Sequence, residues 1–146
     1  MNDTGPGAAG AKAPWHFWAI GVLALLWYAS GAWTIQMAQL GRLEGLSSDE
    51  AAYYAAKPVW LVGTTAIATY GSLLGAILLL ARRGSAAPVF AIALAFILLN
   101  NAIELSNGTS RVYANNAAAV VTTIIALIAL FMVWYSRAMQ RRGVLR

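Results

Sequence analysis

The residues that could do chemistry in this sequence gather at the end of its third long apolar segment. Asn100, Glu104, Asn107 and Arg111 are spaced i, i+4, i+7 and i+11, so one continuous helix would carry all four on one face. Glu104 is the only carboxylate within or beside an apolar segment. Polar and ionisable residues in a membrane span are functional candidates by default. We therefore take Asn100, Asn101 and Glu104 as the candidate polar or transport site.

Two roles are open for Glu104. The helix dipole disfavours a carboxylate at the C-terminal end of a helix by about 0.3–1 kcal/mol, and a nearby cation would offset this cost. Lys57 and Arg111 are both expected on the same side of the membrane, so a structural ion pair is one role. Ion or proton handling is the other. Asn100 and Asn101 lie deeper in the segment and should point into the bundle, where they would form interhelical hydrogen bonds.

No other reactive set is visible in the sequence. The absence of cysteine excludes disulfides, thiolate metal sites and cysteine nucleophiles, and one histidine, His16, cannot form a zinc site alone. There is no Gly-rich phosphate loop, no pair of catalytic carboxylates and no Ser/His/Asp set. We therefore expect no catalytic residue, no metal ligand, no cofactor and no enzymatic activity.

Membrane helices must position these polar residues, because the chain is 60% hydrophobic and only 10% charged. Its apolar segments, at about residues 17–37, 59–80, 88–105 and 117–135, each approach the roughly 20 residues that cross a hydrocarbon core. The expected fold is an all-α membrane protein with four transmembrane helices in an antiparallel bundle.

The segments outside the spans differ in character. Residues 1–14 are rich in Gly, Ala and Pro and predict a disordered cytoplasmic tail. The four-helix domain is expected over residues 15–137, followed by a basic cytoplasmic tail at 138–146.

The connection at residues 38–57 contains a capping box, with Ser47 at the cap and Glu50 three positions later. It predicts a short outer interfacial helix that continues to Lys57. Its role is either a lid on the bundle or a platform for a ligand.

Orientation follows from the distribution of Lys and Arg, because cytoplasmic loops of membrane proteins are enriched in both. Seven of these residues fall in the two terminal segments and the turn after the second span, against three in the other loops: Lys12, Arg82, Arg83, Arg137, Arg141, Arg142 and Arg146 against Arg42, Lys57 and Arg111. Both termini are therefore expected in the cytoplasm. The net charge of +5 is explained by this arrangement, and no nucleic-acid partner is expected.

Small residues in the second span predict close helix packing. Gly63, Gly71 and Gly75 lie at multiples of four residues, and Gly71 and Gly75 form a GxxxG motif. Small residues of this kind allow two helix backbones to approach closely in lipid. The partner is either another span of the same chain or a second subunit, so a homo-oligomer is one arrangement that the sequence leaves open.

Two aromatic residues lie in the middle of the first span. Trp27 and Tyr28 carry polar groups that need partners there, and four residues could supply them: Ser30, Thr64, Thr65 and Thr69. Stacking against a ligand is the alternative role for these rings.

Several stretches are distinctive in composition and order: Trp15-His16-Phe17-Trp18, Pro58-Val59-Trp60, Tyr70-Gly71-Ser72-Leu73-Leu74-Gly75 and Arg142-Gly143-Val144-Leu145-Arg146. With them the chain resembles a group of small bacterial four-span inner-membrane proteins of unknown function, which are sometimes labelled sugar transporters. The resemblance covers nearly the whole chain. It implies a four-helix fold and a multi-pass location in the bacterial inner membrane, and it assigns no binding or catalytic residue.

Two functions are consistent with this sequence. The first is a non-enzymatic integral membrane protein with an accessory or structural role in the lipid bilayer. The second is a small oligomeric transporter for a small solute such as a sugar, with proton coupling through Glu104. A dry, closed bundle with Glu104 facing the headgroups would favour the first, whereas a polar cavity that reaches Asn100 and Glu104 would favour the second.

Overall fold

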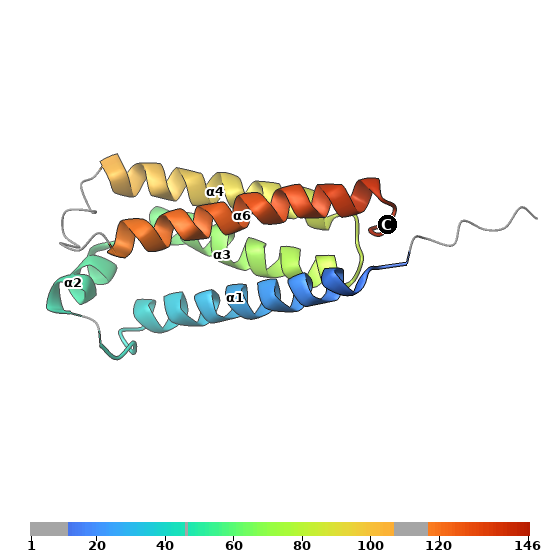
Figure 1. Ribbon diagram of the computed structural model, residues 1–146. Helices are drawn as coiled ribbons and strands as arrows, with labels where there is room; N and C mark the ends of the chain where they lie inside the picture. The colour runs from blue at the N-terminus through green and yellow to red at the C-terminus, as the bar shows by residue number, and fades with distance from the viewer. Residues whose placement is uncertain (1–11, 46, 107–116) are drawn as a thin grey trace, which may run out of the picture.

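The computed structural model describes residues 12–45, 47–106 and 117–146. These residues are helical with short connections, and no strand occurs among them (Figure 1). The helices are α1 (Trp15–Gln39), α2 (Ser48–Ala56), α3 (Val59–Leu80), α4 (Ala86–Ser106) and α6 (Ala117–Arg141). The expected all-α class and the short helix between the first two spans are confirmed.

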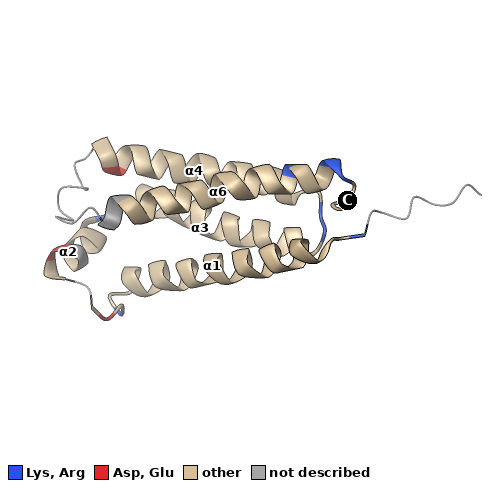
Figure 2. Ribbon diagram, in the orientation of Figure 1, with Lys and Arg blue, Asp and Glu red and all other residues tan. Residues whose placement is uncertain are grey.

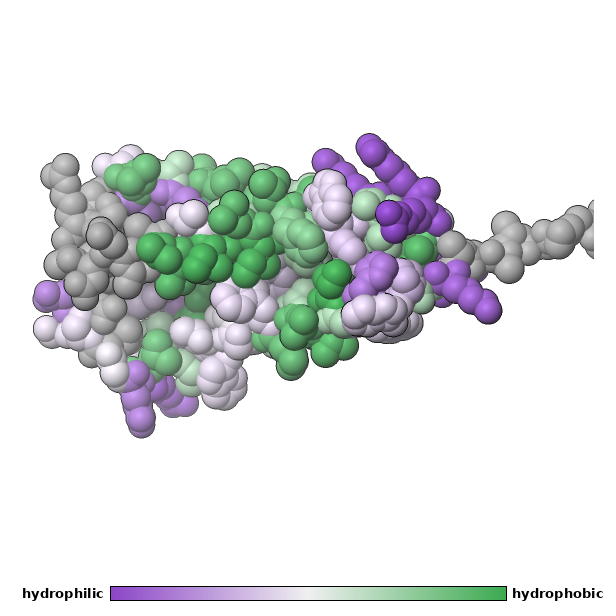
Figure 3. Space-filling view, in the orientation of Figure 1, coloured by the Kyte–Doolittle hydropathy of each residue, from purple (hydrophilic) through white to green (hydrophobic). Residues whose placement is uncertain are grey.

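Four of the helices in the described part of the chain, α1, α3, α4 and α6, are long and apolar enough to cross a membrane. Large apolar side chains also cover their outer surfaces: Leu26 is 62% exposed, Ile92 56% and Leu127 59%. Such a surface is suited to contact with lipid rather than with water. Figure 3 shows apolar residues along the length of the bundle and hydrophilic residues near its two ends. The protein is therefore a multi-pass membrane protein.

The four long helices pack in chain order. α3 packs most extensively on α4, α1 packs on α3, and α6 packs on α4. Consecutive long helices run in opposite directions, as expected for an antiparallel bundle (Figure 1). α2 contacts α1 and lies across the end of the bundle where α1 finishes. We call this the α2 end.

The opposite end of the bundle, which we call the basic end, holds Lys12, Arg82, Arg83, Arg137, Arg141, Arg142 and Arg146. In Figure 2 these residues gather around the start of α1, the turn between α3 and α4, and the end of α6. The expectation that these three segments lie together is confirmed.

Several helix boundaries differ from those expected. α1 runs from Trp15 to Gln39, two residues beyond the expected 17–37 at each end. α4 begins at Ala86, so Pro88 lies in its first turn rather than at its start. Proline is tolerated there because the N–H that it lacks would have no intrahelical partner. α6 continues to Arg141, beyond the expected end of the domain at residue 137.

The predicted basic tail at 138–146 is wrong as a separate element. After α6 the chain turns at Gly143, whose φ of 70° favours glycine, and returns to the bundle. Val144 and Leu145 are 2% and 4% exposed. The N–H of Arg146 donates to the carbonyl of Arg82 at 2.8 Å, and Arg82 Nε donates to the carbonyl of Val144 at 3.0 Å. We call residues 143–146 the C-terminal strap.

The predicted tail at 1–14 lies mostly outside the described residues.

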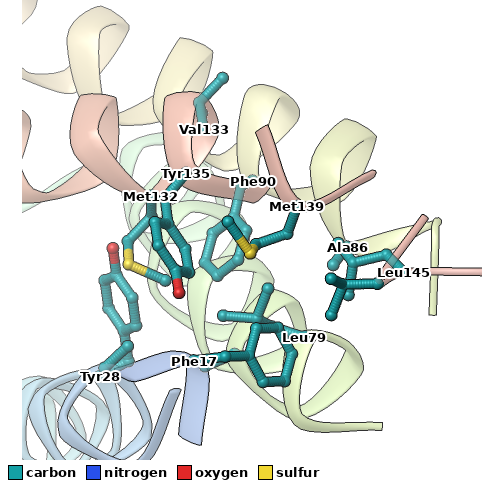
Figure 4. Packing of buried hydrophobic residues seen from close by; sticks show 13 residues of the cluster. Phe17, Tyr28, Leu79, Ala86, Phe90, Met132, Val133, Tyr135, Met139 and Leu145 are labelled. Carbon is teal, nitrogen blue, oxygen red and sulfur yellow. The ribbon is translucent and has the colours of Figure 1, made fainter. Parts of the chain in front are cut away.

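An apolar core fills the half of the bundle nearest the basic end. Phe17 of α1, Leu79 of α3, Phe90 of α4 and Met132 of α6 are each at most 2% exposed and belong to one buried cluster. Figure 4 shows their side chains converging from the four helices, with Leu145 of the strap beside Ala86. This half of the bundle is closed by direct side-chain packing.

The glycines of α3 have different surroundings. A Cβ atom built on Gly75 would lie 2.8 Å from the ring of Phe90, and one on Gly71 would lie 3.4 Å from the Cβ of Ala93. Both glycines therefore face α4 of the same chain. A Cβ on Gly63 would meet nothing within 4 Å, so Gly63 does not pack closely against another described span of this chain, and a second subunit stays the alternative partner predicted for it. Since a helix has 3.6 residues per turn, steps of four drift by about 40° each and turn Gly63 away from the α4 face.

Candidate functional site

A cavity of about 430 Å³ lies in the half of the bundle nearest the α2 end. Its walls come from all four long helices, and α2 contributes Tyr54. The volume falls within the range of about 300–1,000 Å³ that is typical of small-molecule sites. Most of the lining surface is apolar, but many of the lining residues carry a hydroxyl or amide group: Tyr28, Ser30, Thr34, Tyr54, Thr65, Thr69, Ser72, Thr122, Asn100 and Asn101. We call it the polar cavity.

The cavity has a buried base and an open side. Ser72 of α3 and Asn100 of α4 are 1% and 8% exposed and lie at the base. Lining residues on α1 and α6 are more exposed, with Trp27 at 43% and Val121 at 54%. The more exposed lining residues thus come from α1 and α6, two helices that do not pack extensively on each other in the described part of the chain.

Asn100 connects α4 to α3. Its Oδ1 accepts hydrogen bonds from the hydroxyls of Thr64 at 2.9 Å and Thr65 at 3.3 Å, and its Nδ2 donates to the carbonyl of Phe96 at 2.8 Å. The expectation that Asn100 points into the bundle and forms an interhelical hydrogen bond is confirmed. A buried amide must satisfy its polar atoms inside the protein, and these contacts do so.

Asn101, the next residue of α4, has different surroundings. It is half-buried and borders the polar cavity. Within the described part of the chain its side chain forms no hydrogen bond, so the expected interhelical bond from Asn101 is not found there. Its amide is available to a molecule in the cavity.

Glu104 borders the polar cavity and forms an ion pair with Lys57, which follows α2. The Nζ of Lys57 lies 3.3 Å from Oε1, and the hydroxyl of Tyr53 donates to the same oxygen at 3.0 Å. Lys57 Nζ also lies 5.4 Å from the centroid of the Tyr53 ring. The predicted ion pair with Lys57 is confirmed. Asn107 and Arg111, the other members of the predicted stripe, lie outside the described residues.

Burial differs between the two charged partners. The side chain of Lys57 is 5% exposed, and that of Glu104 is 32% exposed. A nearly buried ammonium must be paired, because an isolated buried charge is costly. Lys57 is therefore held against α4 by Glu104, and this contact connects the α2–α3 junction to the end of α4.

An aromatic wall from α1 completes the cavity. Trp27 and Tyr28 both line it, and Tyr28 is 5% exposed. The Tyr28 hydroxyl has no hydrogen-bond partner among the described residues, so the prediction that a nearby serine or threonine would satisfy it is wrong. Ser30 donates instead to the carbonyl of Trp27 at 2.8 Å, and Thr65 donates to Asn100. Figure 4 shows the Tyr28 ring extending from α1 toward α6.

Sequence reasoning named Thr65 and Thr69 as possible partners of Trp27 and Tyr28, but it did not identify the cavity wall that they form with Ser72. Thr65, Thr69 and Ser72 line it from α3, and their i, i+4, i+7 spacing would place them on one helix face. This spacing was a usable signal. Thr122 of α6 also lines the cavity, but nothing in the sequence around it indicates which way its side chain points.

The arrangement is suited to binding a small polar molecule. Among residues 12–45, 47–106 and 117–146, no group of three His, Cys, Asp or Glu side chains could hold a metal ion. Amide, hydroxyl and aromatic groups can position a small polar molecule by hydrogen bonds and stacking. Comparisons with protein-family models, with curated proteins and with solved structures find no match for this chain.

Proposed function

We propose that this integral membrane protein is a carrier that binds a small solute in the polar cavity and moves it across the bilayer. The observation that supports this function is the cavity of about 430 Å³ that reaches Asn100, Asn101 and Glu104 in the α2-end half of a four-span bundle. Polar groups gathered at membrane depth are expensive and mark solute or ion pathways. Of the two functions considered from the sequence, the transporter is therefore the better supported.

The two halves of the bundle supply different parts of a carrier. The half nearest the α2 end contains the cavity, whereas Phe17, Phe90 and Met132 close the half nearest the basic end. A binding site in one half of a bundle whose other half is closed resembles one state of an alternating-access cycle. The opposite state would require the apolar core to separate.

The setting that we propose for this carrier is the bacterial inner membrane, with both termini in the cytoplasm. The charge distribution between the two ends of the bundle supports this orientation, because seven Lys and Arg residues lie at the basic end. We further propose a homo-oligomer, since four helices enclose little space for a complete path. The exposed face around Gly63 leaves room for close contact with a second copy.

An accessory or structural role is the second candidate. It is favoured by the ion pair between Lys57 and Glu104, which occupies the carboxylate that a proton-coupled carrier would use. In that case the chain would act through its stable bundle and its lipid-facing surfaces, and the cavity would have no transported ligand.

The decisive experiment is uptake into proteoliposomes that contain the purified protein. Radiolabelled sugars and organic cations would be supplied with and without an imposed proton gradient, and empty liposomes would give the background. We expect saturable uptake by the wild type and a loss of most of it in Glu104→Gln, because this residue borders the cavity and supports its wall.

The matched control is Glu44→Gln, which removes an exposed carboxylate from the connection before α2. This variant should transport like the wild type. If every solute enters wild-type proteoliposomes no faster than empty liposomes, the carrier proposal is rejected and the accessory role is favoured. Uptake that is unchanged by the proton gradient would remove proton coupling from the proposal but leave the carrier function.

A further inference from the structure

We infer that the polar cavity selects uncharged molecules with hydrogen-bond donors, and that Lys57 determines this selectivity by cancelling the charge of Glu104. The inference rests on the proposed solute-binding function and deepens it by naming the class of ligand. It makes Lys57 a specificity-determining residue even though its own side chain does not line the cavity.

Glu104 is the only Asp, Glu, Lys or Arg among the described residues that line the cavity. A lone carboxylate in a largely apolar, half-enclosed cavity would attract cations, because Coulomb attraction is strong where water is scarce. The electrostatic character of the site therefore depends on what neutralises this one group.

Lys57 provides that neutralisation. Its Nζ lies 3.3 Å from Glu104 Oε1, and its side chain is only 5% exposed, so solvent and salt screen the pair weakly. The ring of Tyr53 lies beside the ammonium as well, with 5.4 Å between Nζ and the ring centroid. A cation that approached Glu104 through the cavity would meet a carboxylate whose charge is already balanced, and the ammonium of Lys57 would repel it.

The groups left available to a ligand are uncharged or neutralised hydrogen-bonding groups. Lys57 and Tyr53 both bond to Oε1 of Glu104, so the second carboxylate oxygen remains as an acceptor. The Asn101 amide has no hydrogen-bond partner among the described residues and borders the cavity. One acceptor from Glu104 and one amide together favour a ligand with hydroxyl or amide groups.

Two probes of nearly equal shape test this inference. Choline carries a hydroxyl and a quaternary ammonium, whereas 3,3-dimethyl-1-butanol carries the same hydroxyl on an uncharged isosteric skeleton. Binding would be measured by calorimetry on the full chain in nanodiscs, with empty nanodiscs subtracted to remove partitioning into lipid. We expect the wild type to bind the alcohol at least roughly tenfold more tightly than choline.

Replacement of Lys57 should reverse the preference. Lys57→Met keeps the length and apolar character of the side chain and leaves Glu104 as an uncompensated charge beside the cavity. We expect it to gain choline binding by roughly tenfold or more. Lys57→Arg, which retains the positive charge, should behave like the wild type. The double variant Lys57→Met/Glu104→Gln should lose the gained choline binding.

A second variant tests the same claim if Lys57→Met does not fold. Asn101→Asp is nearly isosteric, leaves the ion pair intact and places an unpaired carboxylate in the cavity. This variant should gain choline binding, because the new carboxylate at residue 101 would have no cationic partner, whereas the carboxylate of Glu104 is paired with Lys57. Circular dichroism and size-exclusion chromatography would show whether each variant is folded.

Three results would overturn the inference: choline binding by the wild type as tight as that of the alcohol, no saturable alcohol binding by the wild type, or folded variants with an added net negative charge that still do not bind choline. These measurements concern binding alone. If the protein shows the expected selectivity but no uptake into proteoliposomes, the carrier function is contradicted and this inference stands. If it shows uptake without this selectivity, the inference is contradicted and the carrier function stands.

Discussion

Gly75 of α3 lies directly against the ring of Phe90 of α4. A Cβ atom at residue 75 would be 2.8 Å from two carbon atoms of that ring, a distance that real side chains essentially never show. Phe90 is itself only 1% exposed, so it has little room to move. The closest approach of α3 and α4 therefore depends on the missing side chain of Gly75.

The first prediction concerns this contact. Gly75→Ala should destabilise the bundle by about 1–3 kcal/mol, because overpacking at a close helix contact forces side chains or backbone to shift. Gly63→Ala is the matched control, since a Cβ there meets nothing within 4 Å. Its effect should stay within about 0.5 kcal/mol. Unfolding in detergent with increasing SDS, followed by circular dichroism, measures both; equal effects would refute the assigned packing.

The second prediction concerns the hydrogen bonds between α3 and α4. Asn100→Ala removes the acceptor of Thr64 and Thr65 and should cost about 1 kcal/mol of stability, in the range of interhelical hydrogen bonds in membranes. Leu99→Ala, at a position that is 45% exposed, is the control and should cost less. The same SDS titration provides the comparison. An Asn100→Ala variant as stable as the wild type would contradict a structural role for these bonds.

The third prediction concerns the ion pair of Lys57 and Glu104. Removal of one partner leaves the other without its counter-charge, so Lys57→Met and Glu104→Gln should each destabilise by about 1–3 kcal/mol. The double variant should be more stable than the sum of the single effects implies, because neither charge remains. A double-mutant cycle measures this coupling. Strictly additive effects would show that the pair contributes nothing.

The fourth prediction concerns orientation. The chain has no native cysteine, so single cysteines give unambiguous labels. Ser48→Cys should react with a membrane-impermeant maleimide in intact cells, and Arg142→Cys should react only after permeabilisation, because the basic end is expected in the cytoplasm. The reverse pattern would show that the assigned topology is inverted.

Much of the fold could be predicted from the sequence, since span length and apolar composition are enough to locate helices in a bilayer. The start and end expected for the second span, 59–80, coincide with α3. The expected start of the third span at Pro88 and the expected end of the domain at residue 137 were less accurate. Proline is allowed anywhere in a first helical turn, and charged residues such as Arg137 and Arg141 extend a helix beyond the hydrocarbon core.

The candidate site was predictable only in part. The burial of Asn100 follows from the polarity of its side chain within an apolar span. The pairing of Glu104 with Lys57 follows from the side of the membrane on which both residues are expected. Both properties can be read from the sequence. The cavity itself depends on the rotation of each helix about its axis. That rotation is set by packing between helices, for example by Phe90 against Gly75. The spacing of Thr65, Thr69 and Ser72 indicates one face of α3, but no comparable pattern in α6 indicates which way Thr122 points.

The C-terminal strap has a consequence for any opening of the basic end. Through the contacts of Arg82 with Val144 and Arg146, it connects the end of α6 to the turn between α3 and α4. These hydrogen bonds join segments that the apolar core also holds together, so the basic end is closed twice. In the proposed carrier cycle, both the core contacts and the strap contacts would have to break before this end could open. The last residues of the described chain therefore add to the free energy needed to open the basic end.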